Sequence, residues 1–324
     1  MLSRPIVVAS LAALAPLFVL YSAFANDWPI RPVKIVVGLA PGGATDSLAR
    51  IIAQHASEHF GQPFLIENRA GAGGTIAAET IARSQADGYS LLMVNPSQMS
   101  ISPAISRQRY DPVKDFAPIS IVGSNPFVLC VNAKTPVNSY AEFVDLVRRE
   151  PGKLSYGSGG IGNTTHLSMA YFLKLANLDM IHVPYKGGAP AMADLLAGHI
   201  TAMFASLPDA LPYARSGQVR LLALSSGERS PKLPDVPTVA EQGLRQYKML
   251  TWHGLVAPTT TPPQIVDSLA QQIALALKDP KVLERVASLG VDPVGTGPKH
   301  LAETIKSDLS LWGAAVDVAG VKNP

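Results

Sequence analysis

The sequence predicts an α/β protein built from two doubly wound lobes. Short runs rich in valine, isoleucine and leucine alternate with helical patterns along almost the whole chain, which is typical of sheets covered by helices on both faces. The alternation starts afresh once, near residue 124. A chain of 324 residues, of which 47% are hydrophobic, is long and apolar enough to bury two such cores.

The first lobe is predicted from four strands and the helices between them. In chain order the strands are VKIVVGLA, FLIENR, SLLMVN and PISIVG. One helix is expected to begin near Asp46, because Leu48, Ile51 and Ile52 follow at helical spacing, and another near Thr75. Strand and helix alternate here as a doubly wound sheet requires.

The second lobe begins with the run PFVLCV and repeats the pattern. Its further strands are KLSYG, MIHVPY, ITAMFA and RLLALS, and its helices are expected at residues 139–150, 163–176, 189–198 and 208–216. The only cysteine of the chain, Cys130, lies in the first of these runs. We expect a small buried side chain there, and a lone cysteine excludes an internal disulfide.

Three helices follow the run TWHGLVAP and end the chain. They are expected at residues 262–278, 280–289 and 298–317, and each begins near a proline, which is favoured in the first turn of a helix. Because these helices bring few strands of their own, we expect all three to pack onto the first lobe.

The chain should therefore cross between the lobes twice, near residues 124–126 and 249–254. This predicts a first lobe of residues 26–124 plus 250–324 and a second lobe of residues 125–249, joined by a two-strand hinge. Two hinged lobes form a cleft in which a small ligand can bind. A rigid two-domain enzyme would show the same halves.

The first 25 residues are typical of a signal peptide. Arg4 precedes an apolar run from Ile6 to Leu20, and Ala23 and Ala25 are the small residues that an export peptidase requires, so we expect cleavage after Ala25. A membrane anchor is the alternative, but the run is short for a span and no stop-transfer pattern follows. The mature chain is expected in the periplasm. A formal net charge of +3 gives no indication of a nucleic-acid partner.

A glycine-rich turn, GLAPGGATDSLAR at residues 38–50, links the first strand to the first helix. Gly42 and Gly43 let the backbone approach a ligand closely, and Thr45 or Asp46 is expected to cap the helix. Free N–H groups and the positive end of the helix dipole then face one point, which suits an anion. Phosphate and carboxylate both fit this pattern.

A second turn of the same kind, GSGGIGNTTHL at residues 157–167, opens a helix in the second lobe. Its polar side chains gather at the start of that helix, and they are Ser158, Asn163, Thr164, Thr165 and His166. In one interpretation they only cap the helix, and in the other the remaining donors face the cleft. Two such turns, one on each lobe, would clamp an anionic ligand as the lobes close.

The second turn also fits the dinucleotide-binding pattern G-x-G-x-x-G. The glycines are Gly157, Gly159 and Gly162, and Asp179 lies downstream as a candidate ribose ligand. However, Asp179 precedes its strand MIHVPY, although a ribose-binding acid would end that strand. No nucleotide or other cofactor is therefore predicted.

His55, Glu58 and His59 spell the inverted zinc-protease motif H-x-x-E-H. The helical period places His55 and Glu58 outside the buried face and His59 at its edge, and zinc chemistry would need a third ligand. We interpret them as surface residues and predict no metal site. The sequence holds no G-x-S-x-G, P-loop or C-x-x-C motif, so no catalytic residues are predicted.

Six segments in order resemble one known family over nearly the whole mature chain. They are WPIRPVKIVVGLAPGGATDSLAR, GQPFLIENRAGAGGTIAAE, DGYSLLMVN, YGSGGIGNTTHL, HVPYKGGAPAMADLLAGHI and GLVAPTTTPPQIVDSLA. The family is that of the Bug-type periplasmic solute-binding proteins of tripartite tricarboxylate transporters. The resemblance implies a type II periplasmic-binding-protein (Venus flytrap) fold that closes over a small carboxylate ligand and delivers it to a membrane permease or a sensor kinase.

The resemblance also implies which residues meet the ligand. In such proteins the backbone amides, hydroxyls and ordered waters of the first turn hold a carboxylate, and the second turn and a further loop contribute. The matching positions here are Gly43, Ala44 and Thr45, the turn from Ser158 to His166, and Asn95 and Ser97. A carboxylate is thus the anion that the resemblance implies at the first turn.

The chain departs from the family pattern where ITAMFA ends. Many members have an acidic residue after the MF pair, and in amino-acid-binding members an acid near this point can meet the ligand's ammonium group. This chain has Ala205 followed by Ser206. We therefore expect a di- or tricarboxylate, or an aromatic carboxylate, that carries no amine.

Three classes of function remain open on the sequence. They are a transport receptor, a receptor that reports to a signalling kinase, and an exported enzyme on the same fold. Both receptor classes use the same closed, liganded surface, whereas an enzyme would need catalytic groups that the sequence does not display. A monomer is expected, because both lobes must stay free to move.

Overall fold

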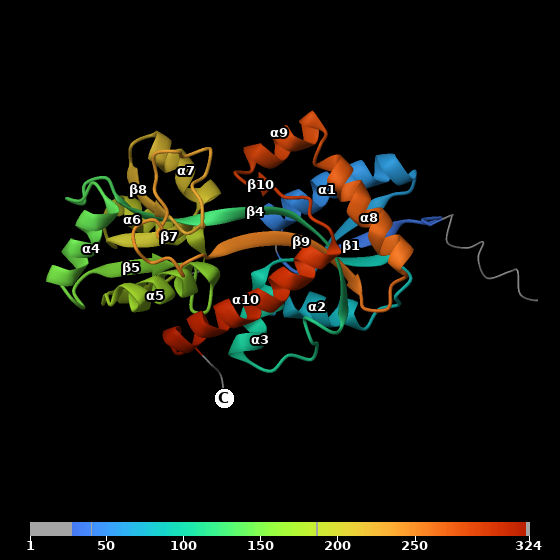
Figure 1. Ribbon diagram of the computed structural model, residues 1–324, viewed down its shortest axis with the longest axis horizontal. Coiled ribbons are helices and arrows are strands. Elements are labelled where there is room, and N and C mark those ends of the chain that lie inside the picture. The colour runs from blue at the N-terminus through green and yellow to red at the C-terminus, as the bar shows by residue number, and fades with distance from the viewer. Residues whose placement is uncertain (1–27, 40, 186, 322–324) are drawn as a thin grey trace, which may run out of the picture.

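The structure of the protein is a computed structural model that describes residues 28–39, 41–185 and 187–321 (Figure 1). The predicted signal peptide lies outside these ranges. Two groups of elements lie side by side along the long axis, and strands β4 (Phe116–Asn132) and β9 (Leu250–Pro258) lie where the groups meet. Within the described ranges, no helix is both long and apolar enough to cross a membrane.

The first lobe is built on a mixed sheet. Strand β1 (Val33–Val37) pairs in parallel with β2 (Phe64–Asn68) and with β3 (Ser90–Val94), as expected for strands separated by helices. Strand β9 then pairs antiparallel with β3 and with the first part of β4. Two apolar clusters cover the two faces of this sheet. The covering helices are α1 (Ala44–Phe60), α2 (Thr75–Ala82), α8 (Pro263–Ala276), α9 (Pro280–Ser288) and α10 (Pro298–Ala319).

The second lobe repeats this arrangement with strands and helices close to the predicted ranges. The strands are β5 (Ser155–Ser158), β6 (Ile181–Pro184), β7 (Ala202–Ser206) and β8 (Val219–Leu224), and the helices are α4 (Tyr140–Arg149), α5 (Thr164–Ala176), α6 (Gly188–Ala197) and α7 (Leu207–Arg215). The last part of β4 pairs antiparallel with both β7 and β8. Cys130 is buried there, as predicted, and burial raises the pKa of its thiol to about 12.

The two strands predicted as PISIVG and PFVLCV are one continuous strand, β4, and this prediction was wrong. Residues 116–126 pair with β9, and residues 127–132 pair with β7 and β8, so that β4 belongs to the sheets of both lobes. The expected break at residues 124–125 does not occur, because both residues pair with β9 and Ser124 also pairs with β10 (Asp292–Pro293). The lobe boundaries predicted at residues 124 and 250 stay a prediction.

Short elements without a periodic pattern were missed. They are the 3-10 helix η1 (Ala72–Gly74), the π-helix η2 (Ser97–Ile101), helix α3 (Ser102–Ile105) and strand β10. These pieces are too short for hydrophobic periodicity to show. Two of them bear on the predicted site, because η2 begins at the predicted site residue Ser97 and α3 follows it directly.

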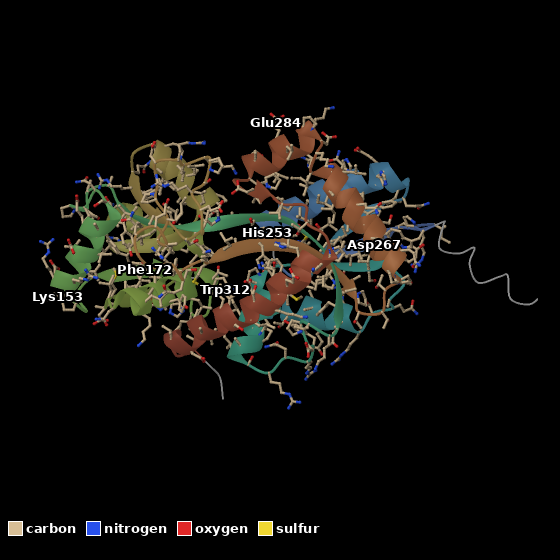
Figure 2. All side chains as sticks on the ribbon, in the orientation of Figure 1. Lys153, Phe172, His253, Asp267, Glu284 and Trp312 are labelled. Atoms are coloured by element: carbon tan, nitrogen blue, oxygen red, sulfur yellow. The ribbon has the colours of Figure 1, made fainter. Side chains whose placement is uncertain are left out.

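Helix α10 forms as predicted, but it packs on both lobes. Leu301 and Ile305, in its first half, belong to an apolar cluster of the first lobe. Trp312 and Val316, in its second half, are buried in the main cluster of the second lobe together with Phe172. Figure 2 shows Trp312 close to the elements that carry Phe172. The expectation that this helix packs only onto the first lobe was therefore wrong for its second half.

A carboxylate on α10 gives a prediction about pH. Asp308 accepts hydrogen bonds from the indole N–H groups of Trp252 (2.7 Å) and Trp312 (3.3 Å). Burial raises the pKa of Asp308 from 3.8 to about 6. The folded state therefore disfavours the ionised form of Asp308. The stability that protonated Asp308 contributes is fully present below pH 4 and is lost as the pH rises through 6.

We expect Asp308→Asn to stabilise the protein at pH 7.5 by on the order of 2 kcal/mol, because the amide keeps an acceptor oxygen and never ionises. Near pH 4 the variant and the natural protein should be equally stable. Urea denaturation at both pH values measures this. A gain of the same size at pH 4 would show that ionisation of Asp308 is not the cause.

Candidate functional site

The first glycine-rich turn joins β1 to α1. Gly42 has φ +92°, a conformation that favours glycine, and Gly43 precedes the helix without any side-chain cap. The expectation that Thr45 or Asp46 caps α1 was wrong, because both side chains are bonded elsewhere. The N–H groups of the first helical turn lack intrahelical acceptors, so this end of α1 presents donors and a positive dipole.

Asp46 holds this turn in shape. Asp46 is 3% exposed, and its side chain accepts hydrogen bonds from the Gly42 N–H (2.9 Å), from Asn68 Nδ2 (2.9 Å) and from two nitrogens of Arg50 (3.0 Å each). Burial alone would raise the pKa of Asp46, but the bonds from Arg50, Gly42 and Asn68 together lower it. The carboxylate is thus ionised and fixed under the turn.

Thr45 contacts a histidine that the sequence analysis missed. Its hydroxyl lies 3.0 Å from Nδ1 of His253, which is on β9 and is only 4% exposed. Figure 2 labels His253 near the middle of the molecule. Burial lowers the pKa of His253 to about 4, so the ring is neutral at physiological pH, and its Nε2 atom has no hydrogen-bond partner among the described residues. One polar residue inside the apolar run TWHGLVAP was the available signal.

The predicted residues Asn95 and Ser97 lie at the end of β3, where η2 begins. Asn95 Oδ1 accepts a hydrogen bond from the Ser97 N–H (2.9 Å), and the Asn95 N–H donates to Oε1 of Gln98 (3.0 Å). Gln98 is fully buried, and its Nε2 atom has no partner among the described residues. A methyl group on Gly38 would lie 3.0 Å from that atom, so the glycine leaves room for the amide.

The polar side chains of the second turn mostly bond to the turn itself. Asn163 caps α5 by accepting a hydrogen bond from the Thr165 N–H (3.0 Å), and the Thr165 hydroxyl accepts one from the Gly159 N–H (2.9 Å). The Thr164 hydroxyl donates to Asn163 Oδ1 (3.3 Å), and Ser158 is fully buried. These side chains shape the turn, and most of its backbone N–H groups are also bonded within it, namely those of Gly159, Gly160, Gly162, Asn163 and Thr165.

Two histidines lie under this turn. Nδ1 of His166 accepts a hydrogen bond from the Gly162 N–H (3.2 Å), and Nε2 of His182, on β6, lies 2.7 Å from the Ser158 hydroxyl. The two rings are stacked, with centroids 3.9 Å apart and planes 12° apart. Burial, together with the neighbouring His182, lowers the pKa of His166 to about 4, and burial lowers that of His182 as well. The sequence analysis did not identify His182.

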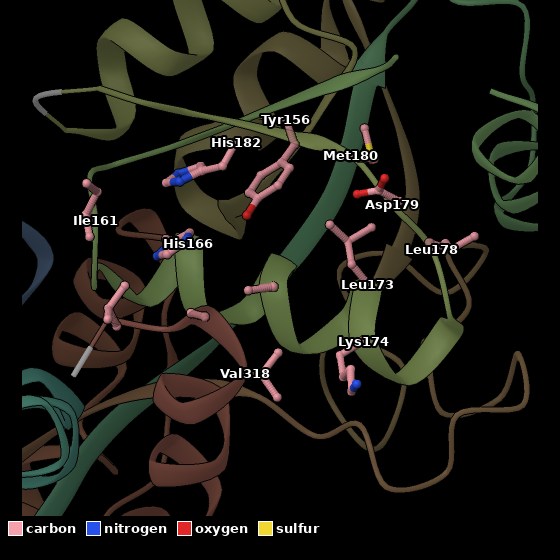
Figure 3. A pocket seen from close by; sticks show the side chains of 13 residues that line it. Tyr156, Ile161, His166, Leu173, Lys174, Leu178, Asp179, Met180, His182 and Val318 are labelled. Carbon is pink, nitrogen blue, oxygen red and sulfur yellow. The ribbon is translucent and has the colours of Figure 1, made fainter. Parts of the chain in front are cut away.

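A cavity of about 450 Å³ opens beside these rings (Figure 3). Tyr156, His166 and His182 line one side of it, and Lys174 and Val318 line the other. Of the predicted site residues only His166 touches this cavity. It lies along α5 and the end of α10 rather than at the uncapped end of α1, so it is not the predicted ligand site.

Ala205 and Ser206, where the chain departs from the family pattern, end β7. Ala205 is buried in an apolar cluster of the second lobe. Ser206 precedes α7, and its hydroxyl accepts a hydrogen bond from Nδ2 of Asn125 (3.3 Å). Asn125 lies on β4 where the strand passes from one sheet to the other, and its Oδ1 has no partner among the described residues. Ser206 therefore contacts the connection between the lobes.

The second turn touches the first lobe directly. A methyl group on Gly162 would lie 3.0 Å from Cδ1 of Ile105, at the end of α3. Since α3 continues η2, the loop that carries Asn95 and Ser97 and the turn that carries Ser158–His166 belong to neighbouring parts of the two lobes.

The inverted zinc motif forms no metal site in the described part of the chain. Nδ1 of His55 lies 2.8 Å from Nε2 of Gln272, on α8. Among the residues that the structure covers, no group of three or more histidine, cysteine, aspartate or glutamate side chains is placed to hold a metal ion.

Comparisons with known proteins give consistent matches. Residues 48–321 match the family described as tripartite tricarboxylate transporter family receptor. Protein BugT of Bordetella pertussis is 35% identical over 303 residues, which are 92% of this chain and 92% of BugT.

Solved structures agree with the sequence matches. The R. palustris protein Rpa4515 with adipate has a TM-score of 0.79 at 35% identity, over 90% of this chain and 98% of that one. MatC from Rhodopseudomonas palustris with bound malate has a TM-score of 0.75 at 33% identity, over 89% of this chain and 100% of that one. The predicted α/β fold of the periplasmic binding proteins is confirmed.

Proposed function

The chain belongs to the tripartite tricarboxylate transporter receptor family, and from this we propose that it is an exported receptor that binds a small carboxylate between its two lobes. It delivers this ligand to the membrane subunits of a tripartite tricarboxylate transporter. The ligand is a di- or tricarboxylate, or an aromatic carboxylate, without an amine. Related structures hold adipate and malate, which are dicarboxylates that carry no amine.

The uncapped start of α1 is the observation that carries this proposal. Asp46 fixes the turn by accepting the Gly42 N–H. The N–H groups at Gly43, Ala44 and Thr45 are therefore held in position, and no side chain caps this end of the helix. The buried and unpartnered Nε2 of His253, next to Thr45, is a further donor in this region when Nδ1 accepts from the Thr45 hydroxyl and the ring carries its hydrogen on Nε2. We place one carboxylate of the ligand here.

The rest of the proposed site comes from both lobes. The residues are Asn95 and Ser97 from the first lobe, Ser158, Asn163, Thr164, Thr165 and His166 from the second turn, and Ala205 and Ser206 at the end of β7. Most of these side chains, and most backbone N–H groups of the second turn, bond within their own turns, so they set the shape of the site, and the N–H groups at the uncapped start of α1 provide the main contacts. No cofactor or metal takes part.

Export, location and assembly follow from the same proposal. A signal peptide is cut after Ala25, and the mature receptor works as a monomer in the periplasm. The family is one of periplasmic receptors. A role as ligand sensor for a signalling kinase uses the same liganded surface and is the alternative partner assignment.

One contact bears on the alternative of an exported enzyme. The Ser158 hydroxyl and His182 Nε2, 2.7 Å apart, resemble a nucleophile and its base. However, Ser158 is fully buried, its hydroxyl oxygen also accepts the Gly160 N–H (3.2 Å), and among the described residues no carboxylate bonds to the His182 ring. These contacts favour a receptor over an enzyme. Turnover of any bound ligand would instead support the enzyme alternative.

Ligand binding should show as a rise in melting temperature. With residues 26–324, freed of ligand by unfolding and refolding, we expect shifts with adipate, malate, citrate or benzoate. Ligand at a hundredfold excess over its dissociation constant adds about 2.7 kcal/mol of stability, which is a few degrees for a chain of this size. Shifts only with NAD would overturn the carboxylate site, and tight binding of glutamate or aspartate would overturn an amine-free ligand.

A negative charge introduced at the start of α1 tests whether the ligand carboxylate binds there. Ala44→Asp puts a carboxylate where the ligand's carboxylate should lie, and we expect it to abolish the shift without destabilising the free protein, since an acid suits the first turn of a helix. Ala141→Asp, in the exposed first turn of α4, is the matched control. If Ala44→Asp keeps the full shift, the ligand binds elsewhere.

A further inference from the structure

We propose that His166 and His182 are positioning residues that hold the second glycine-rich turn, residues 157–166, in the shape that it presents to the first lobe. Neither ring needs to touch the ligand for this role. Where the inference concerns ligand affinity, it rests on the proposed function. Where it concerns the order of the turn, it stands without a ligand.

His166 fixes the tip of the turn. Gly162 has φ +74° and contacts α3 of the first lobe, so its peptide group lies where the two lobes meet. The only hydrogen bond that the structure gives this N–H, within the described residues, goes to Nδ1 of His166 (3.2 Å). Nδ1 accepts this bond only when it carries no proton, which requires the neutral ring with its hydrogen on Nε2.

His182 fixes the start of the turn. The Ser158 hydroxyl is shared among the Gly160 N–H (3.2 Å), the Gly160 carbonyl (3.3 Å) and Nε2 of His182 (2.7 Å). The short contact favours donation of the hydroxyl proton to Nε2, while the oxygen accepts from Gly160. Protonation of Nε2 would reverse the bond and leave the hydroxyl proton to the longer contact with the Gly160 carbonyl.

The stack couples the two rings. With centroids 3.9 Å apart, two imidazolium ions would repel each other, and protonated Nδ1 of His166 would face the Gly162 N–H as a second donor. The other titratable or charged groups beside the rings are Tyr156 on β5, which stacks on His182 with centroids 4.9 Å apart, Lys174 on α5, and Asp179 before β6. From α10, Val318 and Ala319 line this side without charge.

The arrangement makes the turn sensitive to acid. The pKa of His166 is lowered from 6.5 to about 4, so the stability that the neutral ring contributes is full above pH 6.5 and is lost as the pH falls to about 4, where the ring of the folded protein itself takes up a proton. This protonation near pH 4 would weaken the turn and lower the affinity for a carboxylate while the rest of the fold persists.

Amide hydrogen exchange of residues 157–167 in the unliganded mature chain tests the inference first. His166→Phe keeps a ring but removes the acceptor, and we expect exchange of this segment to become about tenfold faster, the effect of losing one hydrogen bond. His166→Gln keeps an acceptor that does not titrate and should restore protection. His300→Gln, on the exposed surface of α10, is the matched control and should change nothing.

Affinity for adipate at several pH values is the second arm. For the natural protein the dissociation constant should rise as the pH falls from about 5 through 4, where the ring of folded His166 takes up its proton, and the rise should be smaller for His166→Gln. Comparing the two cancels the titration of adipate itself. His182→Gln should likewise bind adipate less steeply with pH, whereas His182→Phe should weaken binding about tenfold at pH 7.5.

Two outcomes would overturn the inference. One is unchanged exchange of residues 157–167 in His166→Phe, and the other is an equal increase over all segments, which would mark a general loss of stability. If no carboxylate binds to any variant but the turn loses protection in His166→Phe, the proposed function fails while the positioning role stands. If adipate binds to the natural protein and to both phenylalanine variants equally, the proposed function stands and the positioning role fails.

Discussion

Replacing Asp46 by alanine is expected to lower the free energy of unfolding by about 3 kcal/mol. The residue is 3% exposed, and its carboxylate accepts hydrogen bonds from the Gly42 N–H, from Asn68 and from Arg50. Its removal leaves the Gly42 and Asn68 donors without an acceptor in a buried place and removes an acid from the first turn of α1, where the helix dipole favours it. Arg50 is half exposed and can be hydrated, so its share of the loss is small.

Urea denaturation of residues 26–324 at pH 7.5 measures this effect. Glu79→Ala is the matched control, because Glu79 also pairs with an arginine four residues later, and with Arg109 at 3.6 Å, but is more exposed than Asp46. The control should lose less than about 1 kcal/mol. Equal losses in the two variants would mean that Asp46 acts only as a surface ion pair and does not hold the turn.

Asp46→Ala should abolish ligand binding, although it only partly destabilises the fold. When the carboxylate beneath Gly42 is absent, the N–H groups at the start of α1 lose their fixed direction, and the proposed site at Ala44 and Thr45 loses its preorganisation. We therefore expect Asp46→Ala to show no melting-temperature shift with adipate or malate, even at temperatures where the variant is fully folded.

Most strands and helices could be predicted because the signals that define them are local. The helix predicted at 163–176 is observed as α5, Thr164–Ala176, and its start is fixed by Asn163, a favourable capping residue. Strand β4 shows where local signals fail. Gly123, Ser124 and Pro126 together indicate a turn, but β9 and β10 pair with this segment from both sides and keep it extended.

The sequence allowed us to predict the backbone turns of the candidate site, but not the hydrogen bonds between its side chains. Glycine turns that open helices are visible in the sequence, so Gly43 and the turn at 157–166 could be named. Thr45 and His253 are 208 residues apart, and Ser158 and His182 belong to different strands, so these pairs exist only after folding. The bonds formed on folding also decide that Asn163 and Thr165 shape their turn instead of pointing freely away from it.

Helix α10 illustrates the same limit and leads to the last prediction. Leu301, Ile305, Trp312 and Val316 lie at four- and seven-residue intervals, so the apolar stripe of an amphipathic helix was visible. A stripe says nothing about which lobe it covers. In the folded protein its first half packs against the first lobe and its second half against the second, so that α10 joins the lobes in addition to β4 and β9.

Trp312→Ala should therefore cost about 3–5 kcal/mol and act on one lobe more than on the other. Trp312 is fully buried in the cluster that contains Phe172 on α5, and the substitution removes a large side chain and the hydrogen bond to Asp308. Leu301→Ala, equally buried in the first half of α10, is the control. We expect amide exchange in α5 to rise for Trp312→Ala and exchange in α2 to rise for Leu301→Ala. Equal changes in both segments would show that α10 and the two lobes unfold as one unit, and the lobes could then not move on β4 and β9 while α10 stays bound to both.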